Sequence, residues 1–258
     1  MGKQKKKVSK AMKQRQKEVG TPAIIFNFDG TVMDTATAVI ASYRHVFAKY
    51  GKASELTPER QQMVLGKSVP VMMKEFFPDL KVDETAGEFR SYQHYHLRDL
   101  IQPMPGVLDL FKWLKKHDYK IAIVSSRSRE SVVAALEHEE MTPYVDVIIG
   151  RYFTGKAEGE KDSLRKACEL MKKKCCIYIG DMPEDIIRGH MVGAFTIAYV
   201  SSRRLLYDII DAGPDFVTAD YKQVRKLLEG EPYWLAYDLI PETTEDTEAS
   251  EEKEEAKA

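Results

Sequence analysis

FNFDGTVMDT, residues 26–35, decides the fold, and it overlaps the end of a short apolar run. The run AIIFNF (23–28) is almost continuously apolar, which is typical of a strand buried on both faces of a parallel sheet. Asp29 and Gly30 form a pair that is common in turns. We therefore expect a buried strand that ends abruptly in polar side chains.

Four more apolar runs follow, separated by helix-like segments. The runs are KIAIVS (120–125), VDVIIG (145–150), CCIYIG (175–180) and FTIAYV (195–200). Amphipathic stretches such as VLDLFKWLKKH (107–117) and DSLRKACELMKKK (162–174) have the spacing of crossover helices. The alternation predicts an α/β fold with a doubly wound, Rossmann-like parallel sheet.

One interval contains only helix-like segments, namely TATAVIASYRHVFAKYG, TPERQQMVLG, VPVMMKEFF and DETAGEFRSYQHYHLRDL. An insertion placed directly after the first strand would lie over the carboxyl ends of the strands, where ligands bind in open α/β sheets. We expect an α/β core of residues 21–34 and 103–237, a helical cap of residues 35–102, and tails of residues 1–20 and 238–258.

The two tails carry opposite charge, although the net charge of the chain is only -1. Residues 1–18 hold eight Lys or Arg and one Glu, whereas residues 241–258 hold eight Asp or Glu and two Lys. Neither has apolar periodicity, so we expect both to be disordered. The basic tail could anchor nucleic acid or an anionic membrane, but we favour a solvated tail because it has no interleaved aromatic residues.

Composition excludes several classes of protein. Hydrophobic residues make up 43% of the chain and charged residues 31%, and no apolar run approaches the roughly 18 residues that a membrane span needs. No signal-type apolar stretch follows the basic N-terminus, so we expect a cytoplasmic protein. Cys168, Cys175 and Cys176 lack CxxC spacing and are expected to be buried, small hydrophobic residues.

Polar residues cluster at the ends of four predicted strands. They are Asn27, Asp29, Gly30 and Thr31 at the first, Ser125 and Ser126 at the second, Lys156 and Lys161 after the third, and Asp181 and Asp185 after the fourth. Ser125, Ser126 or Asp181 could instead cap the next helix. The coincidence at four successive strand ends favours a single site.

These motifs resemble those of the haloacid dehalogenase superfamily: DxDGT, a strand-terminal Thr or Ser, a Lys, and GDxxxD. FNFDGTVMDT, IAIVSSRSRE and IYIGDMPEDI carry the likeness, which covers about residues 22–230. The helical insertion is similar to that of the phosphoglycolate phosphatase and phosphoglucomutase branch. The resemblance implies a haloacid dehalogenase-like core and a magnesium-dependent phosphatase for a small phosphorylated metabolite, such as phosphoglycolate or a sugar phosphate.

The resemblance also implies a role for each residue. Asn27 stands at the nucleophile position, Asp29 is the acid and base, and Ser125 and a lysine hold the phosphoryl group. Substrate contacts are expected from Ser126, Lys156, Gly30 and Thr31, and Mg²⁺ ligands from Asn27, the backbone of Asp29, Asp181 and Asp185.

Asn27 departs from the family, which has a nucleophilic aspartate there. An amide oxygen is a poor nucleophile, so formation of an aspartyl phosphate should fail or become very slow. Binding of Mg²⁺ and phosphate should survive, because an amide oxygen still ligates the metal and does not repel a dianion. An engineered substitution, a natural pseudo-phosphatase and a misread codon all account for Asn27.

The sequence defines less well which lysine binds the phosphoryl group and what the side chains of residues 90–100 do. Relatives usually show KPxP, whereas this chain has GKAEGEKDSL (155–164), and we favour Lys161 over Lys156. In RSYQHYHLRDL (90–100), the side chains of Tyr92, His94, His96 and Arg98 either line a pocket or pack against neighbours, and we favour packing.

Three functions therefore compete. The leading one is a phosphatase of phosphoglycolate phosphatase type whose turnover is impaired by Asn27. The second is a non-catalytic protein that binds a phosphorylated ligand, and the third is a phosphomutase.

Overall fold

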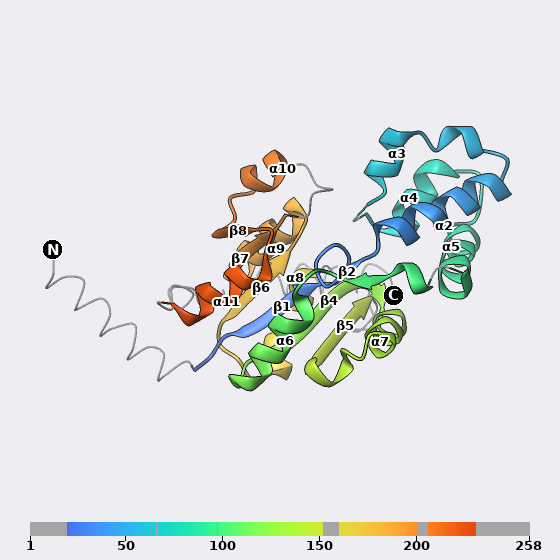
Figure 1. The fold of residues 1–258 in the computed structure, drawn as a ribbon. Coiled ribbons are helices and arrows are strands. Elements are labelled where there is room, and N and C mark those ends of the chain that lie inside the picture. Colours follow the sequence, from blue (N-terminus) through green and yellow to red (C-terminus); the bar gives the residue numbers. More distant parts are fainter. Residues whose placement is uncertain (1–19, 66, 97, 152–159, 201–205, 231–258) are drawn as a thin grey trace, which may run out of the picture.

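The computed structural model describes residues 20–65, 67–96, 98–151, 160–200 and 206–230. Six strands form one parallel sheet (Figure 1). They are β1 (Ala23–Asn27), β4 (Lys120–Ser128), β5 (Val147–Arg151), β6 (Cys176–Gly180), β7 (Phe195–Tyr199) and β8 (Phe216–Thr218), in the spatial order β5-β4-β1-β6-β7-β8. The predicted α/β fold is confirmed, and β8 is an additional strand.

The apolar runs alternate between the two faces of the sheet. In β1, Ile24 and Phe26 join one buried cluster, whereas Ala23 and Ile25 join another. All four side chains are fully buried. Successive strand residues point to opposite faces, so a strand covered on both sides must be apolar at every position, as its sequence indicated.

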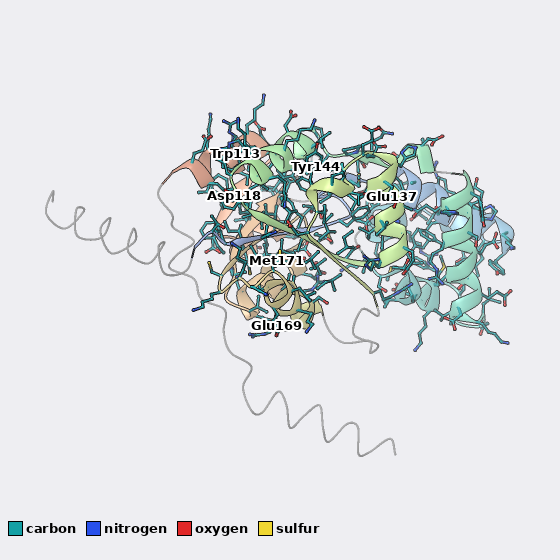
Figure 2. The ribbon with its side chains drawn as sticks, turned by 90° about the horizontal axis from the view of Figure 1, so that it is seen from below. Trp113, Asp118, Glu137, Tyr144, Glu169 and Met171 are labelled. Atoms are coloured by element: carbon teal, nitrogen blue, oxygen red, sulfur yellow. The ribbon has the colours of Figure 1, made fainter. Side chains whose placement is uncertain are left out.

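Helices cover both faces. Helices α6 (Val107–Lys116), α7 (Arg129–His138) and α11 (Tyr221–Glu229) pack on the face of Phe26, whereas α8 (Glu160–Leu170), α9 (Pro183–Met191) and α10 (Leu206–Asp211) pack on the other. Figure 2 shows Trp113 of α6 on one side of the strands and Glu169 and Met171 at the α8 side. A short 3₁₀ helix, η3 (Thr142–Tyr144), precedes β5.

The chain reverses its direction of winding at β1. It moves from β1 to β4 and β5 on one side, and then to β6, β7 and β8 on the other. Such a switch point leaves a crevice at the carboxyl ends of the central strands. The ends of β4, β1 and β6 border this crevice.

The segment between β2 (Met33–Asp34) and β3 (Gln102–Pro103) is helical and lies beyond one end of the sheet (Figure 1). It comprises α2 (Ala36–Lys49), η1 (Ala53–Glu55), α3 (Pro58–Met63), α4 (Val69–Phe76), α5 (Val82–His96) and η2 (Arg98–Leu100). This helical insertion has a buried cluster of its own, which includes Tyr43, Phe47, Phe76 and Phe89. An independent core allows the insertion to hold its shape next to the sheet.

The insertion leaves and re-enters the core through a two-stranded antiparallel ribbon. Met33 pairs with Pro103, and Asp34 pairs with Gln102. The two connections therefore run side by side at one point of the core.

The three cysteines are buried, as the sequence predicted. Cys168, Cys175 and Cys176 are free and buried. None of the helices described is both long and apolar enough to cross a membrane.

Candidate active site

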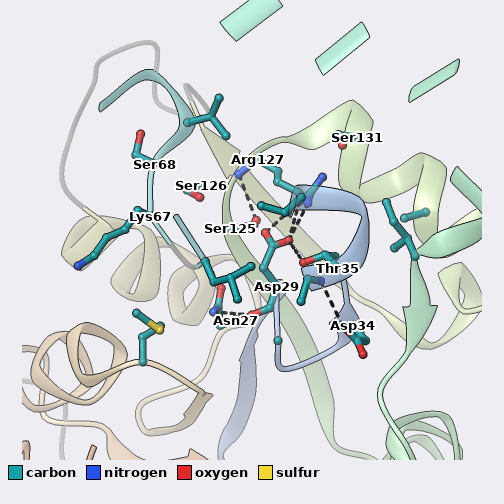
Figure 3. A pocket seen from close by; sticks show the side chains of 18 of the residues that line it. Asn27, Asp29, Asp34, Thr35, Lys67, Ser68, Ser125, Ser126, Arg127 and Ser131 are labelled. Carbon is teal, nitrogen blue, oxygen red and sulfur yellow. Dashed lines mark hydrogen bonds and ion pairs between the residues drawn. The ribbon is translucent and has the colours of Figure 1, made fainter. Parts of the chain in front are cut away.

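A cavity of about 940 Å³ lies between the carboxyl ends of the central strands and the helical insertion. The core contributes Asn27 at the end of β1, Asp29 just after it, and Ser125 and Ser126 of β4 (Figure 3). The insertion contributes Val64, Leu65, Phe89 and Gln93, among others. A concave site of this size, with apolar walls and a few polar groups, is typical of a small-molecule site.

Asn27 is the last residue of β1, and its amide has a fixed orientation. Its Oδ1 accepts a hydrogen bond of 2.7 Å from the backbone N–H of Phe28. Because that N–H can only donate, the oxygen must face it and the amide nitrogen must face the other way. Asn27 Nδ2 then lies 3.2 Å from the backbone oxygen of Asp29, 3.1 Å from Asp181 Oδ1 and 3.4 Å from Asp185 Oδ2.

Asp181 and Asp185 form a buried acidic pair at the end of β6. Asp185 accepts hydrogen bonds from the backbone N–H groups of Asp181 and Met182 and from the hydroxyl of Tyr178, and it lies 3.3 Å from Arg188. Burial, together with the charge of Asp181, raises the pKa of Asp185 to about 7. The sequence suggested that Asp181 could be a helix cap, but the cap position belongs to Met182.

The acidic pair suits a divalent cation. Three oxygen atoms, from the Asp29 backbone, Asp181 and Asp185, surround the amide nitrogen of Asn27 at 3.1–3.4 Å. Hard oxygen donors of this kind are those that Mg²⁺ prefers. Within the described ranges, no three His, Cys, Asp or Glu side chains form a metal-binding group. For the side-chain oxygen of Asn27 to become a further metal ligand, its amide group would have to flip.

The raised pKa of Asp185 predicts how stability depends on pH when metal is removed. The unfolded chain loses this proton near the ordinary value of 3.8, whereas the folded chain keeps it up to about pH 7. The folded state binds more protons across that window, so stability should decline as the pH rises. We expect the melting temperature in EDTA to fall as the pH rises from about pH 4 to about pH 7, and Asp185→Asn to flatten this slope. Identical slopes for the two proteins would contradict the prediction.

Asp29 is held by a guanidinium and a hydroxyl (Figure 3). Arg127 Nε lies 2.9 Å from both carboxylate oxygens of Asp29, and Arg127 Nη2 lies 2.7 Å from Oδ1. The hydroxyl of Thr35 donates to the same Oδ1 at 2.6 Å. Thr35 is the N-cap residue of α2, but its side chain makes no cap hydrogen bond. These contacts fix the Asp29 carboxylate at the cavity wall.

Gly30 is required by backbone geometry. Its φ is +74°, in the left-handed region that favours glycine, and a Cβ there would lie 2.3 Å from Asp181 Oδ2. Thr31, expected to bind substrate, is fully buried and is not among the residues that line the cavity. Its hydroxyl donates to Asp181 Oδ1 at 3.0 Å. The structure thus differs from the expectation for Thr31, whose hydroxyl contacts a carboxylate and which does not line the cavity.

Gly30→Ala is predicted to destabilise the protein by about 2–4 kcal/mol, because it combines a left-handed backbone with a clash against Asp181. Gly51→Ala is the matched control. Gly51 also has a positive φ of +73°, but nothing lies within 4 Å of its Cβ position, so only the backbone penalty of about 1 kcal/mol applies. Urea unfolding measures both values, and equal losses would contradict the clash.

Ser125 and Ser126 end up in the cavity wall as expected. Ser125 is buried, and its Oγ accepts from the backbone N–H of Arg127 at 3.1 Å, which leaves its own proton available for a ligand. The alternative that either serine caps α7 is wrong. The strand continues to Ser128, whose side chain accepts from the backbone N–H of Ser131.

The structure describes only some of the remaining residues for which the sequence suggested a role. Lys156 lies outside the described residues, and for Lys161 the structure gives the backbone, in α8, and not the side chain. Tyr92 stacks on His45 with ring centroids 3.8 Å apart, which is the favoured packing role, whereas His94 lines the cavity. The side chains of His96 and Arg98 also fall outside the description.

Comparison with known proteins decides the family. Residues 24–199 match the model of the haloacid dehalogenase-like hydrolases. The chain belongs to this family. A protein of Caldanaerobacter subterraneus assigned as the pyrophosphatase PpaX is 30% identical to this hydrolase over 217 residues, which are 81% of this chain and 94% of the relative. The pyrophosphatase PpaX of Halalkalibacterium halodurans is 27% identical over 180 residues, 67% of this chain and 80% of its own.

Solved structures agree on the fold of this haloacid dehalogenase-like hydrolase. A predicted phosphatase from Clostridium acetobutylicum superposes with a TM-score of 0.71 at 21% identity, covering 81% of this chain and 99% of its own. A protein of Lactobacillus delbrueckii assigned as a phosphoglycolate phosphatase gives 0.68 at 22% identity, covering 80% and 97%. At these identities the likeness concerns the fold alone.

Sequence reasoning missed two residues of this hydrolase's site, Arg127 and Gln93. Arg127 follows Ser125 by two residues, so regular alternation of side chains along a strand would have placed it on the same side. The pairing of β4 is in fact irregular between Val124 and Ser128. Gln93 lies on α5 and is separated from Arg127 by 34 positions. No local sequence pattern announces a contact of that range.

Proposed function

We propose that this haloacid dehalogenase-like hydrolase carries the site of a magnesium-dependent phosphatase for small phosphorylated compounds, in which Asn27 separates binding from turnover. One observation carries the proposal. The amide of Asn27 stands at the end of β1, in contact with Asp181 and Asp185 and on the same cavity as Asp29 and Ser125. An aspartate in its place would have the surroundings of a nucleophile.

Each residue has a task in the proposed reaction. Ser125 would donate its hydroxyl proton to a phosphoryl oxygen, and a lysine, for which Lys161 remains our choice, would balance the phosphoryl charge. Asp29 would protonate the leaving oxygen and then take a proton from water. Bound Mg²⁺, held by the Asp29 backbone, Asp181 and Asp185, would supply charge stabilisation for the phosphoryl oxygens. The amide at Asn27 cannot form the aspartyl phosphate, so a ligand would bind and remain uncleaved.

The proposed substrates are small and anionic. Two PpaX relatives point to pyrophosphate, whereas the solved structures include a protein assigned as a phosphoglycolate phosphatase. The cavity of about 940 Å³ admits both. The described residues that line it include the basic side chains Lys67, Arg90, Arg151 and Arg188. Of these, Lys67 pairs with Glu184 and Arg188 with Asp185.

Thermal denaturation of the native chain tests the proposal. Mg²⁺ with pyrophosphate or 2-phosphoglycolate should raise the melting temperature, since a ligand that binds only the folded state stabilises it. Ser125→Ala should reduce the shift, because it removes a donor to the phosphoryl group. Absence of any shift, for every phosphorylated compound tried with Mg²⁺, would refute a phosphate site.

A second candidate is a protein that binds a phosphorylated ligand and has no catalytic role. The hydrogen bonds that Asn27 makes favour it, because the amide satisfies the acidic pair without a metal. The two candidates differ in what Asn27→Asp does: a phosphatase gains turnover, and a binding protein does not.

A further inference from the structure

Gln93 is a buried polar residue that the helical insertion brings to the cavity. It lies near the end of α5, the residue is 6% exposed, and it lines the cavity. Its Oε1 accepts a hydrogen bond of 2.6 Å from Arg127 Nη1. Gln93 is thus connected through one guanidinium to Asp29 of the core.

The contact with Arg127 fixes which way the Gln93 amide points. A guanidinium has only donors, so the amide oxygen must face Arg127 and the amide nitrogen must face away from it. That nitrogen, Nε2, is buried and has no hydrogen-bond partner among the residues that the structure describes. Buried donors in native proteins are almost always satisfied, so a donor of this kind on a residue that lines the cavity points to an acceptor that arrives with the ligand.

The surroundings of Gln93 show which part of a ligand it would meet. Arg127 uses one edge for Asp29 and its Nη1 for Gln93, so Gln93 lies on the far side of the guanidinium from the acid and base. Arg90, one helical turn before Gln93, lines the same cavity. In the proposed reaction Asp29 faces the leaving oxygen, and the groups beyond it face the remainder of the leaving group.

We propose that Gln93 is the specificity-determining residue of this site, and that its Nε2 donates a hydrogen bond to an anionic oxygen on the leaving group. The preferred substrates are then phosphate compounds whose leaving group carries its own negative charge, such as a carboxylate or a second phosphoryl group. This inference rests on the proposed function, because it assigns Gln93 a place relative to the acid and base.

Gln93→Glu is the sharpest test variant. It keeps an oxygen that accepts from Arg127 and replaces the amide donor by a second oxygen that repels an anion. Gln61→Glu is the matched control, because Gln61 also lies in the insertion and its Oε1 accepts from an arginine, Arg44, at 3.0 Å. Gln61 is not among the residues that line the cavity.

Two substrates of equal length distinguish a loss of leaving-group recognition from a general loss of activity. 2-Phosphoglycolate has a carboxylate where 2-hydroxyethyl phosphate has a neutral hydroxymethyl group. In the Asn27→Asp protein, Gln93→Glu should lower kcat/KM for 2-phosphoglycolate by roughly 10- to 100-fold and for 2-hydroxyethyl phosphate by less than about 3-fold. Gln61→Glu should change neither. Equal losses for both substrates, or no loss for either, would overturn the role of Gln93.

A binding measurement tests the role of Gln93 independently of the proposed function. If Asn27→Asp releases no phosphate from any compound, the proposed function fails, and calorimetry on the native chain with Mg²⁺ still compares the same two ligands. The assignment is supported if 2-phosphoglycolate binds more tightly than 2-hydroxyethyl phosphate and if Gln93→Glu abolishes this difference in affinity. Equal affinities before the substitution, or no binding of either compound, reject it.

Discussion

Replacing Asn27 by aspartate is expected to raise the rate of phosphate release by at least about 1,000-fold, because it supplies the nucleophile that the site lacks. The new carboxylate would occupy the end of β1, next to Asp181 and Asp185. Three acidic side chains would then be close together, so the gain should depend fully on Mg²⁺. Release of inorganic phosphate from pyrophosphate, 2-phosphoglycolate and a panel of phosphomonoesters measures the effect.

Asn27→Ala controls for the loss of the amide. It removes the hydrogen bonds to the acidic pair without adding a nucleophile, so it should remain as inactive as the native chain. An Asn27→Asp protein that folds, binds Mg²⁺ and is inert across the panel would refute the phosphatase and favour a binding protein. Isomerised product in place of free phosphate would instead indicate a mutase.

Asp29→Asn, made in the Asn27→Asp protein, is expected to lower kcat by about 100- to 10,000-fold through loss of the general acid and base. The loss should depend on the leaving group. An alkyl phosphate needs a proton on the departing oxygen, whereas p-nitrophenyl phosphate releases a stable anion and needs less help. Comparing methyl phosphate with p-nitrophenyl phosphate therefore measures the acid role directly.

The control for Asp29 is Asp34→Asn. Asp34 lines the same cavity, and its carboxylate accepts a hydrogen bond from the backbone N–H of Ala36. It should change kcat by less than about 10-fold. An equal loss for both phosphates in Asp29→Asn would contradict the acid role and leave Asp29 either as the base for water alone or as the partner that positions Arg127.

The core of the fold was predictable because its signal is local. Strands buried on both faces are almost continuously apolar, and five such runs in the sequence became β1, β4, β5, β6 and β7. The strand β8 has three residues, and Val217 in its middle is 38% exposed, so no apolar run marks it. The ribbon of β2 and β3 contains Pro103 and has only two residues in each strand, which is too short for any periodicity.

The site was predictable where it depends on strand ends and not where it depends on distant contacts. Asn27, Asp29, Ser125 and Asp185 line one cavity because parallel strands end at one edge of the sheet. Thr31 could not be assigned from sequence, because its hydroxyl contacts Asp181, 150 positions away. The same holds for the contact between Arg127 and Gln93, which depends on how the insertion is seated against the core.

The ribbon that joins Met33 to Pro103 and Asp34 to Gln102 also bears on how such proteins diversify. Both ends of the insertion meet at one place, so the whole helical unit can be exchanged for another by joining two neighbouring points, without opening the sheet. A graft of this kind would change Gln93 and its neighbours together and leave Asn27, Asp29 and Asp181 untouched. In the function proposed above, the side chain assigned to substrate preference and those assigned to the chemistry therefore lie on separate pieces of the polypeptide.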